Sequence, residues 1–138
     1  MLAKATARVK AAGWPNVTLA HGDAHAFDVS HLRHTSGATD ADAVVACLAL
    51  TVVDDWEAAF ARTYDDLKPG GRYVILDVHN PAPGLRDRVA AWVAQADTTR
   101  EVWRRLAEQT RDFAMRDLDA DPKRVGGRLF LASGTKPA

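Results

Sequence analysis

The sequence predicts an α/β fold in which a mostly parallel sheet is flanked by helices. Two segments, 42–50 (DAVVACLAL) and 72–78 (RYVILDV), are nearly continuous apolar runs, which is typical of strands buried on both faces. A helical pattern lies between them, and parallel neighbours need such a crossover connection. With 138 residues, 47% of them hydrophobic, the chain can bury one core. We therefore assign residues 1–138 to a single domain.

The first element is an amphipathic helix that ends near Gly13. Its apolar residues recur at steps of three and four, at Leu2, Ala5, Val9 and Ala12. A short strand is predicted next at 17–23 (VTLAHGD), because branched residues follow a Pro-Asn turn signal. The polar stretch 24–40 is predicted to be a loop with one helical turn at 29–33.

An amphipathic helix is predicted to join the two buried strands. Asp54 is its candidate N-cap, and Glu57 stands three residues later in the capping-box position. The apolar stripe of this helix consists of Trp56, Phe60, Tyr64 and Leu67. The segment 68–71 (KPGG) ends the helix, because proline cannot extend it and glycine accepts a positive φ.

The C-terminal half is predicted to contain two helices and two strands. Prolines and a glycine at 81–84 break the chain, and helical segments follow at 85–96 and 98–109. We predict strands at 111–119 (RDFAMRDLD) and 126–136 (GGRLFLASGTK). These strands are expected to form a hairpin, so that an antiparallel C-terminal strand lies at one edge of the sheet.

Composition narrows the classes of partner. The 18 basic and 18 acidic residues balance, which favours neither nucleic acid nor an anionic membrane and does not oppose self-association. No apolar run approaches the roughly 20 residues that span a bilayer, so we expect no membrane insertion. A single cysteine cannot form an intramolecular disulfide and suits a reducing compartment. The sequence therefore predicts a cytoplasmic protein.

Four segments together resemble a class I S-adenosylmethionine-dependent methyltransferase of the small-molecule or phosphatidylethanolamine-type branch. They are MLAKATARVKAAG, NVTLAHGDA, DAVVACLALTVVDDWEAAFARTYDDLKPGGRYVILD and GGRLFLASGTKP. The helix that leads through LKPGG into a strand is the most specific part. The resemblance implies a Rossmann-like fold and transfer of a methyl group from S-adenosylmethionine to a small-molecule acceptor.

The resemblance also implies an N-terminal truncation. In the family, the opening helix follows a glycine-rich first strand, a helix and a second strand whose acidic residue binds the ribose, and this sequence has neither of those strands. Their places would lie between segments 17–23 and 42–50, which leaves unpaired backbone groups on both sides. Either the flanking strands pair with each other, or a second copy supplies the missing neighbour. We predict a homodimer that completes the sheet.

Four residues are implied as cofactor ligands by the resemblance. Asp23 would accept a hydrogen bond from the adenine amino group, and the backbone N–H of Ala24 would meet a ring nitrogen. Leu48 and Ala49 would lie beside the cofactor at the end of the next strand. Without the glycine loop and the ribose carboxylate, the chain alone is expected to bind S-adenosylmethionine weakly, which puts its autonomous activity in question.

A histidine cluster supports an alternative function. Four of the five histidines lie between residues 21 and 34, and the fifth follows a buried strand. The carboxyl ends of parallel strands would bring together His21, His25, Asp77 and His79. Imidazole and carboxylate groups can activate water, with or without a metal, which would make the protein an esterase-like hydrolase. The H-x-D-x-H spacing fits no zinc motif, so we expect no metal. A non-catalytic remnant or a piece of a longer gene product are further alternatives.

Overall fold

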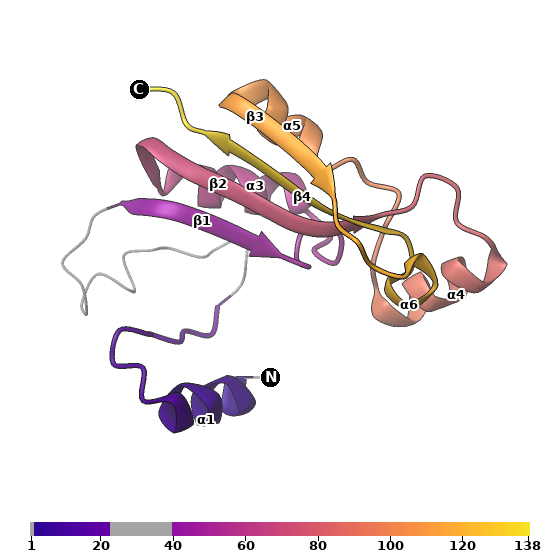
Figure 1. The fold of residues 1–138 in the computed structure, drawn as a ribbon, viewed down its shortest axis with the longest axis horizontal. Coiled ribbons are helices and arrows are strands. Elements are labelled where there is room, and N and C mark those ends of the chain that lie inside the picture. Colours follow the sequence, from indigo (N-terminus) through magenta and orange to yellow (C-terminus); the bar gives the residue numbers. More distant parts are fainter. Residues whose placement is uncertain (1, 23–39) are drawn as a thin grey trace.

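The computed structural model describes residues 2–22 and 40–138. Its elements, in chain order, are α1 (Leu2–Ala12), β1 (Ala41–Cys47), α3 (Trp56–Asp65), β2 (Leu67–His79), α4 (Leu85–Ala94), α5 (Trp103–Gln109), β3 (Arg111–Asp117), α6 (Pro122–Val125) and β4 (Arg128–Thr135). Within these residues, four strands form one sheet in the order β1-β2-β4-β3 (Figure 1).

The sheet is mixed. The predicted parallel pair is present, because β1 runs parallel to β2, with Val45 opposite Val74. The predicted C-terminal hairpin is also present, because β3 and β4 are antiparallel. However, β4 pairs with β2 as well, again antiparallel, so β3 rather than the last strand forms the edge. The α/β fold is thus confirmed, with a larger antiparallel share than the apolar runs predicted.

Two predicted elements differ from the structure. Residues 17–22 form no strand and make no backbone hydrogen bond to another described residue, so this part of the predicted strand at 17–23 is wrong. Branched residues favour an extended backbone, but a strand also needs a neighbour to pair with. Helix α5 begins at Trp103 rather than near Thr98, because the Asp97 carboxylate accepts from both the backbone N–H and the hydroxyl of Thr99. Such local bonds compete with the first turn of a helix.

Both ends of α3 are held by side chains. Asp55, not the predicted Asp54, is the N-cap, and its carboxylate accepts from the backbone N–H of Ala58 at 3.2 Å. At the other end, the Lys136 ammonium donates to the carbonyls of Tyr64 (2.9 Å) and Leu67 (2.6 Å). A cation suits this end of a helix, where unpaired carbonyls accumulate negative partial charge. The C-terminal segment thereby fixes the crossover helix.

The hydrophobic core lies on one face of the sheet, beneath α3 and α5. Phe60 of α3 and Leu106 of α5 meet Tyr73 and Ile75 of β2 and Phe130 of β4, and all five side chains are fully buried. The ring centroids of Phe60 and Tyr73 lie 4.9 Å apart. These side chains belong to alternate positions of the two strands, as the period of a strand requires.

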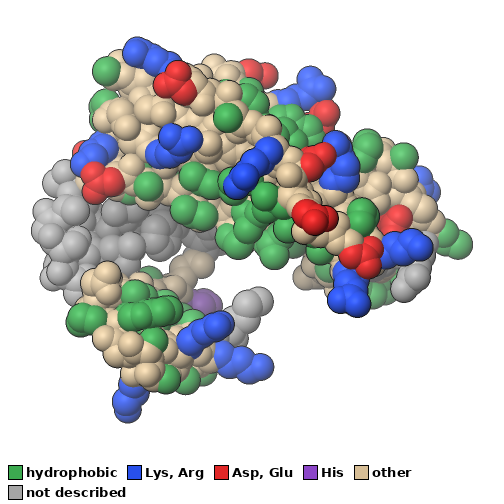
Figure 2. Space-filling view, in the orientation of Figure 1, with side chains coloured by type: hydrophobic (Ala, Val, Ile, Leu, Met, Phe, Trp, Pro, Cys, Tyr) green, Lys and Arg blue, Asp and Glu red, His purple; other side chains and the backbone are tan. Residues whose placement is uncertain are grey.

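The opposite face of the sheet is open. Val44 and Ala46 pack against the core, so Val45 and Cys47 of β1 point the other way, and Val45 is 64% exposed. Figure 2 looks onto this face and shows hydrophobic side chains across its middle. Strand β1 also ends the sheet, so its outer edge has no neighbour among the described residues. Helix α1 buries none of its residues and stands apart from the sheet (Figure 1).

The buried phenol of Tyr73 predicts how stability depends on pH. Burial raises its pKa above the ordinary value of 10.0, and the hydrogen bond with Thr63 opposes this rise. The unfolded chain loses the phenol proton near pH 10, whereas the folded chain keeps it, so the unfolded state binds fewer protons. The free energy of unfolding should therefore fall as the pH rises through the range from about 9.5 to 11.

Denaturant unfolding at several pH values, with the Tyr73→Phe variant as comparison, tests this prediction. Tyr73→Phe should show a shallower loss of stability with pH than the parent chain. Some loss should remain, because burial also raises the pKa of Tyr64. Identical pH slopes in the two proteins would show that Tyr73 does not contribute.

Candidate functional site

A cavity of about 330 Å³ lies where the carboxyl ends of β1 and β2 meet. We call it the central cavity. Ligands of open α/β sheets bind at this edge, in the crevice beyond the strand ends. Leu48, Thr51, Val52, Asp77, Val78 and Val125 are among its lining residues, so β1, β2 and the end of α6 all contribute. Its size is at the lower end of the roughly 300–1,000 Å³ of small-molecule sites.

The loop after β1 forms one wall of the central cavity. Leu48 has a positive φ of 50° and donates its backbone N–H to the carbonyl of Leu76 at 2.8 Å. The carbonyl of Ala49 accepts from the N–H groups of Val52 (3.1 Å) and Val53 (3.2 Å), which closes a turn. The exposed Leu48 side chain lines the cavity, whereas the half-buried Ala49 lies in the turn beside it.

Asp77 and Thr51 connect the ends of β2 and β1. The Thr51 hydroxyl donates to Asp77 Oδ1 at 2.7 Å, and the Thr51 N–H donates to Oδ2 at 3.2 Å. The N–H of Val78 also donates to Oδ1, at 2.8 Å. Asp77 is fully buried, and no Lys or Arg of the described chain forms an ion pair with it. The carboxylate is therefore held by neutral donors.

Arg100 fixes the same loop from outside. Its Nη1 donates to the carbonyls of Val53 (2.5 Å) and Leu50 (3.3 Å), and its Nε pairs with the Asp97 carboxylate at 3.2 Å. The hydrogen bond from the Thr99 hydroxyl lowers the pKa of Asp97, and partial burial opposes this shift. The Thr99 backbone N–H and then Arg100 lower the pKa further. The N–H of Asp97 in turn donates to the carbonyl of Thr51 at 2.7 Å.

Thr51 and Arg100 were missed as site residues at the sequence level. Thr51 is the first polar residue after the apolar run 42–50, and that position was the available signal. Arg100 gives no signal, because the two loop carbonyls that it binds lie about 50 positions earlier in the chain. Both residues hold the loop after β1 in place, and Thr51 also lines the central cavity.

Three of the residues proposed for hydrolysis, His21, Asp77 and His79, are described and lie in different surroundings. His79 is buried, its ring meets Trp103 edge-on at 4.6 Å, and its Nδ1 has no partner among the described atoms. The carboxylate oxygens of Asp77 accept hydrogen bonds from Thr51 and Val78 rather than from His79. His21 is exposed in the segment after α1, and no described hydrogen bond or cavity joins it to His79. His25, Asp23 and Ala24 lie outside the described residues.

Comparison with known proteins identifies the family. A family model described as a methyltransferase domain matches residues 1–75, more than half of the chain. The chain belongs to this methyltransferase domain family. The resemblance found from the residues is thereby confirmed. No curated protein matches the chain significantly.

Solved methyltransferases share the fold of this domain. The N-methyltransferase NodS from Bradyrhizobium japonicum WM9 superposes with a TM-score of 0.71 at 18% identity, covering 99% of this chain and 68% of NodS. A phosphoethanolamine N-methyltransferase 2 from Haemonchus contortus, solved with phosphomonomethylethanolamine and S-adenosylhomocysteine, gives 0.74 at 15% identity, covering 100% of this chain but 41% of that enzyme. An O-methyltransferase family protein from Burkholderia thailandensis gives 0.64 at 17% identity and covers 97% of this chain and 40% of that protein.

The solved structures confirm a Rossmann-like α/β fold, and the family match supports S-adenosylmethionine-dependent methyl transfer in general. In the described part of the methyltransferase domain, no group of three metal-ligating side chains comes together. Nor is any described helix long and apolar enough to cross a membrane.

Proposed function

We propose that this methyltransferase domain binds S-adenosylmethionine at the central cavity and transfers its methyl group to a small-molecule acceptor. The observation that carries the proposal is the position of that cavity, at the carboxyl ends of β1 and β2 in a chain of the methyltransferase family. Open α/β sheets bind ligands at this place. Methyl transfer depends mainly on holding donor and acceptor in line, so a fixed cavity wall is the main requirement.

The described residues fit one part of the cofactor. Leu48, Val52 and Val78 give the cavity an apolar wall that suits a flat base or an aliphatic chain. We propose Leu48 and Ala49, together with Asp23 and Ala24, as the residues that hold the adenine end of S-adenosylmethionine. When bound, the cofactor supplies a methyl group attached to a positively charged sulfur. The Thr51–Asp77 bonds and Arg100 keep the loop that carries Leu48 in place.

We further propose that the chain works as a homodimer in the cytoplasm. The open edge of β1 and the open sheet face are surfaces that another chain can cover, and unpaired strand edges are templates for such pairing. The balanced charge of the sequence does not oppose contact between two copies. The structure gives the hydrolase alternative no comparable support, since His21 and His79 are not joined.

Calorimetric titration of S-adenosylmethionine, with the mass in solution recorded on the same sample, tests this function. We expect a dissociation constant below about 100 μM, equivalent to roughly −5.5 kcal/mol, and the mass of two chains. Leu48→Arg should weaken binding by about tenfold or more, because the longer side chain would fill the part of the cavity where the adenine end binds. The matched control is Leu85→Arg on α4, which is exposed and does not line the cavity.

Two results would contradict the proposal. If millimolar cofactor gives no heat and no methyl transfer, the chain is a non-catalytic member of its family. If Leu48→Arg and Leu85→Arg weaken binding equally, the cofactor does not use the central cavity.

A further inference from the structure

Residues 2–22, which we call the N-terminal segment, combine positive charge with exposed apolar side chains. The segment contains Lys4, Arg8 and Lys10 and no Asp or Glu, and all three cations are exposed. Its exposed large apolar side chains are Leu2, Trp14, Val17 and Leu19. Figure 2 shows blue and green side chains on this segment and no red ones. A chain with zero net charge thus carries a local basic surface.

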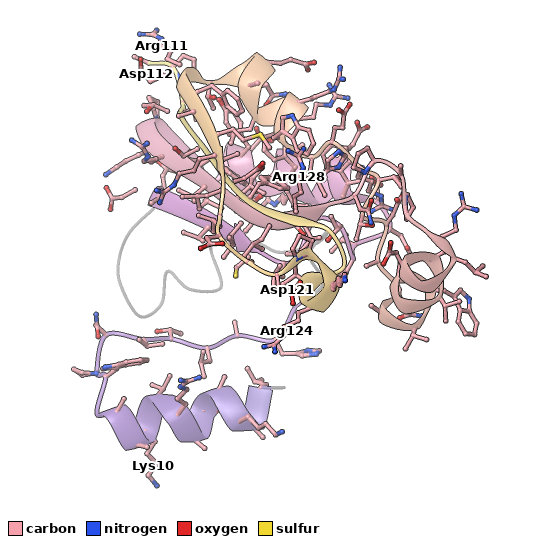
Figure 3. The ribbon with its side chains drawn as sticks, turned by 45° about the vertical axis from the view of Figure 1, so that its right-hand side comes forward. Lys10, Arg111, Asp112, Asp121, Arg124 and Arg128 are labelled. Atoms are coloured by element: carbon pink, nitrogen blue, oxygen red, sulfur yellow. The ribbon has the colours of Figure 1, made fainter. Side chains whose placement is uncertain are left out.

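The N-terminal segment does not pack on the sheet of its own chain. Helix α1 buries none of its residues, and among the described residues the segment hydrogen-bonds only within itself. A cavity of about 530 Å³ lies between α1 and residues 14–19. Figure 3 shows Lys10 on the side of α1 that faces away from the sheet. Because helices in proteins owe most of their stability to packing, this segment needs a partner surface.

Strand β1 and the loop after it provide a surface of complementary character. Along this stretch Val45, Leu48 and Val52 are exposed, from the open face of the sheet to the wall of the central cavity. Residues 40–57, which we call the β1 surface, contain no Lys or Arg, and their acidic residues are Asp40, Asp42, Asp54, Asp55 and Glu57. Asp40 and Asp54 are exposed and form no ion pair within the described chain.

We infer that the N-terminal segment of one copy docks on the β1 surface of a second copy, which returns the same contact. This inference rests on the homodimer proposed above and names the surfaces that form it. Basic residues of the segment meet acidic residues of the β1 surface, and apolar side chains of both are covered between them. A standard interface uses roughly 20–30 residues per side, which the segment approaches in length. The reciprocal contact closes the dimer.

The contact also links the dimer to the central cavity. Leu48 and Val52 belong to the β1 surface and line that cavity. A docked segment from the second copy shields these side chains from water and adds to the cavity wall. Cofactor affinity should therefore be higher in the dimer than in the separated chains.

Crosslinking between two differently tagged full chains tests which surfaces meet. One chain keeps Cys47, which is exposed on β1, and the other carries Ala12→Cys on α1 together with Cys47→Ala. A short bis-maleimide should join the two into a covalent heterodimer. The matched control carries Ala61→Cys with Cys47→Ala, which puts the new thiol at an exposed position of α3, on the other face of the sheet. It should give little heterodimer.

Charge reversal tests the electrostatic part of the contact. Lys10→Glu should weaken the dimer about fivefold at low salt, as measured by analytical ultracentrifugation. Added salt should weaken the parent dimer as well, because it screens exposed charges. Arg111→Glu makes the same change of charge at the start of β3, the opposite edge of the sheet, and should leave the dimer near the parent value. Figure 3 shows Lys10 and Arg111 far apart on the molecule.

The outcomes separate this inference from the proposed function. A dimer in which Ala12→Cys and Ala61→Cys crosslink equally poorly would overturn the inference and leave the homodimer standing. An internal crosslink in a chain that carries both Ala12→Cys and Cys47 would show that the segment covers its own sheet, and would also overturn it. Equal effects of Lys10→Glu and Arg111→Glu would contradict the charge match. A single-chain mass with cofactor binding would remove the dimer but not methyl transfer.

Discussion

Replacement of Phe130 by alanine is expected to lower the free energy of unfolding by about 3–5 kcal/mol. Phe130 is fully buried, lies opposite Asp77 and Asp117 on the neighbouring strands, and meets the ring of Trp103 at 5.1 Å. Alanine would leave a cavity between the sheet and α5 that these rigid neighbours cannot fill. Urea unfolding followed by tryptophan fluorescence measures the loss.

Two controls show whether the loss comes from the cavity. Phe130→Leu keeps most of the buried volume and should cost less than about 1.5 kcal/mol. Trp92→Ala removes a large side chain that is 80% exposed, and should change stability by no more than about 0.5 kcal/mol. If Phe130→Ala costs no more than Trp92→Ala, Phe130 does not have the core position described above.

The second large effect is expected at Gly134, where alanine should cost about 3 kcal/mol. Gly134 is buried opposite Tyr73 in the β2–β4 ladder. An added Cβ would lie 2.6 Å from the Cβ of Thr110 and still closer to its hydroxyl oxygen. Thr110 cannot easily move, because its hydroxyl donates to the carbonyl of Leu106 at 2.6 Å at the end of α5.

A double-mutant cycle isolates the clash. Thr110→Gly removes the obstructing atoms at the cost of one hydrogen bond, so it should be mildly destabilising alone. In combination with Gly134→Ala it should recover about 2 kcal/mol relative to the sum of the two single changes. Strict additivity, measured by urea unfolding of all four proteins, would show that α5 and β4 do not approach each other as closely as described.

Much of the fold was predictable because it depends on local signals. Continuous apolar runs marked β1 and β2, and the helix between them was set by its apolar stripe and by an aspartate N-cap. Element ends were less predictable, since adjacent Asp54 and Asp55 offer equivalent capping chemistry and geometry selects the second. The segment 17–22 was not predictable in this way, because strand formation depends on a neighbouring strand rather than on its own residues.

The candidate site was predictable only in part. Leu48 and Asp77 were expected at the strand ends, and both line the central cavity. The pairing of Asp77 with Thr51 was not predictable. The two residues are 26 positions apart, and only the parallel register of β1 and β2 brings them together. The burial of His79 against Trp103 likewise depends on where α5 packs, which no local pattern states. The position of a side chain at a strand end therefore does not indicate which partners it contacts.

The open face of the sheet has a practical consequence for spectroscopy. Cys47 is the only cysteine in the sequence, and it is exposed on this face in β1, whose outer edge pairs with no described strand. A spin label or fluorophore coupled to its thiol would therefore occupy one known position on the apolar surface. Dipolar coupling between labels would appear if two copies bring their β1 edges together. The presence or absence of this coupling would therefore show whether a second copy covers the sheet in solution.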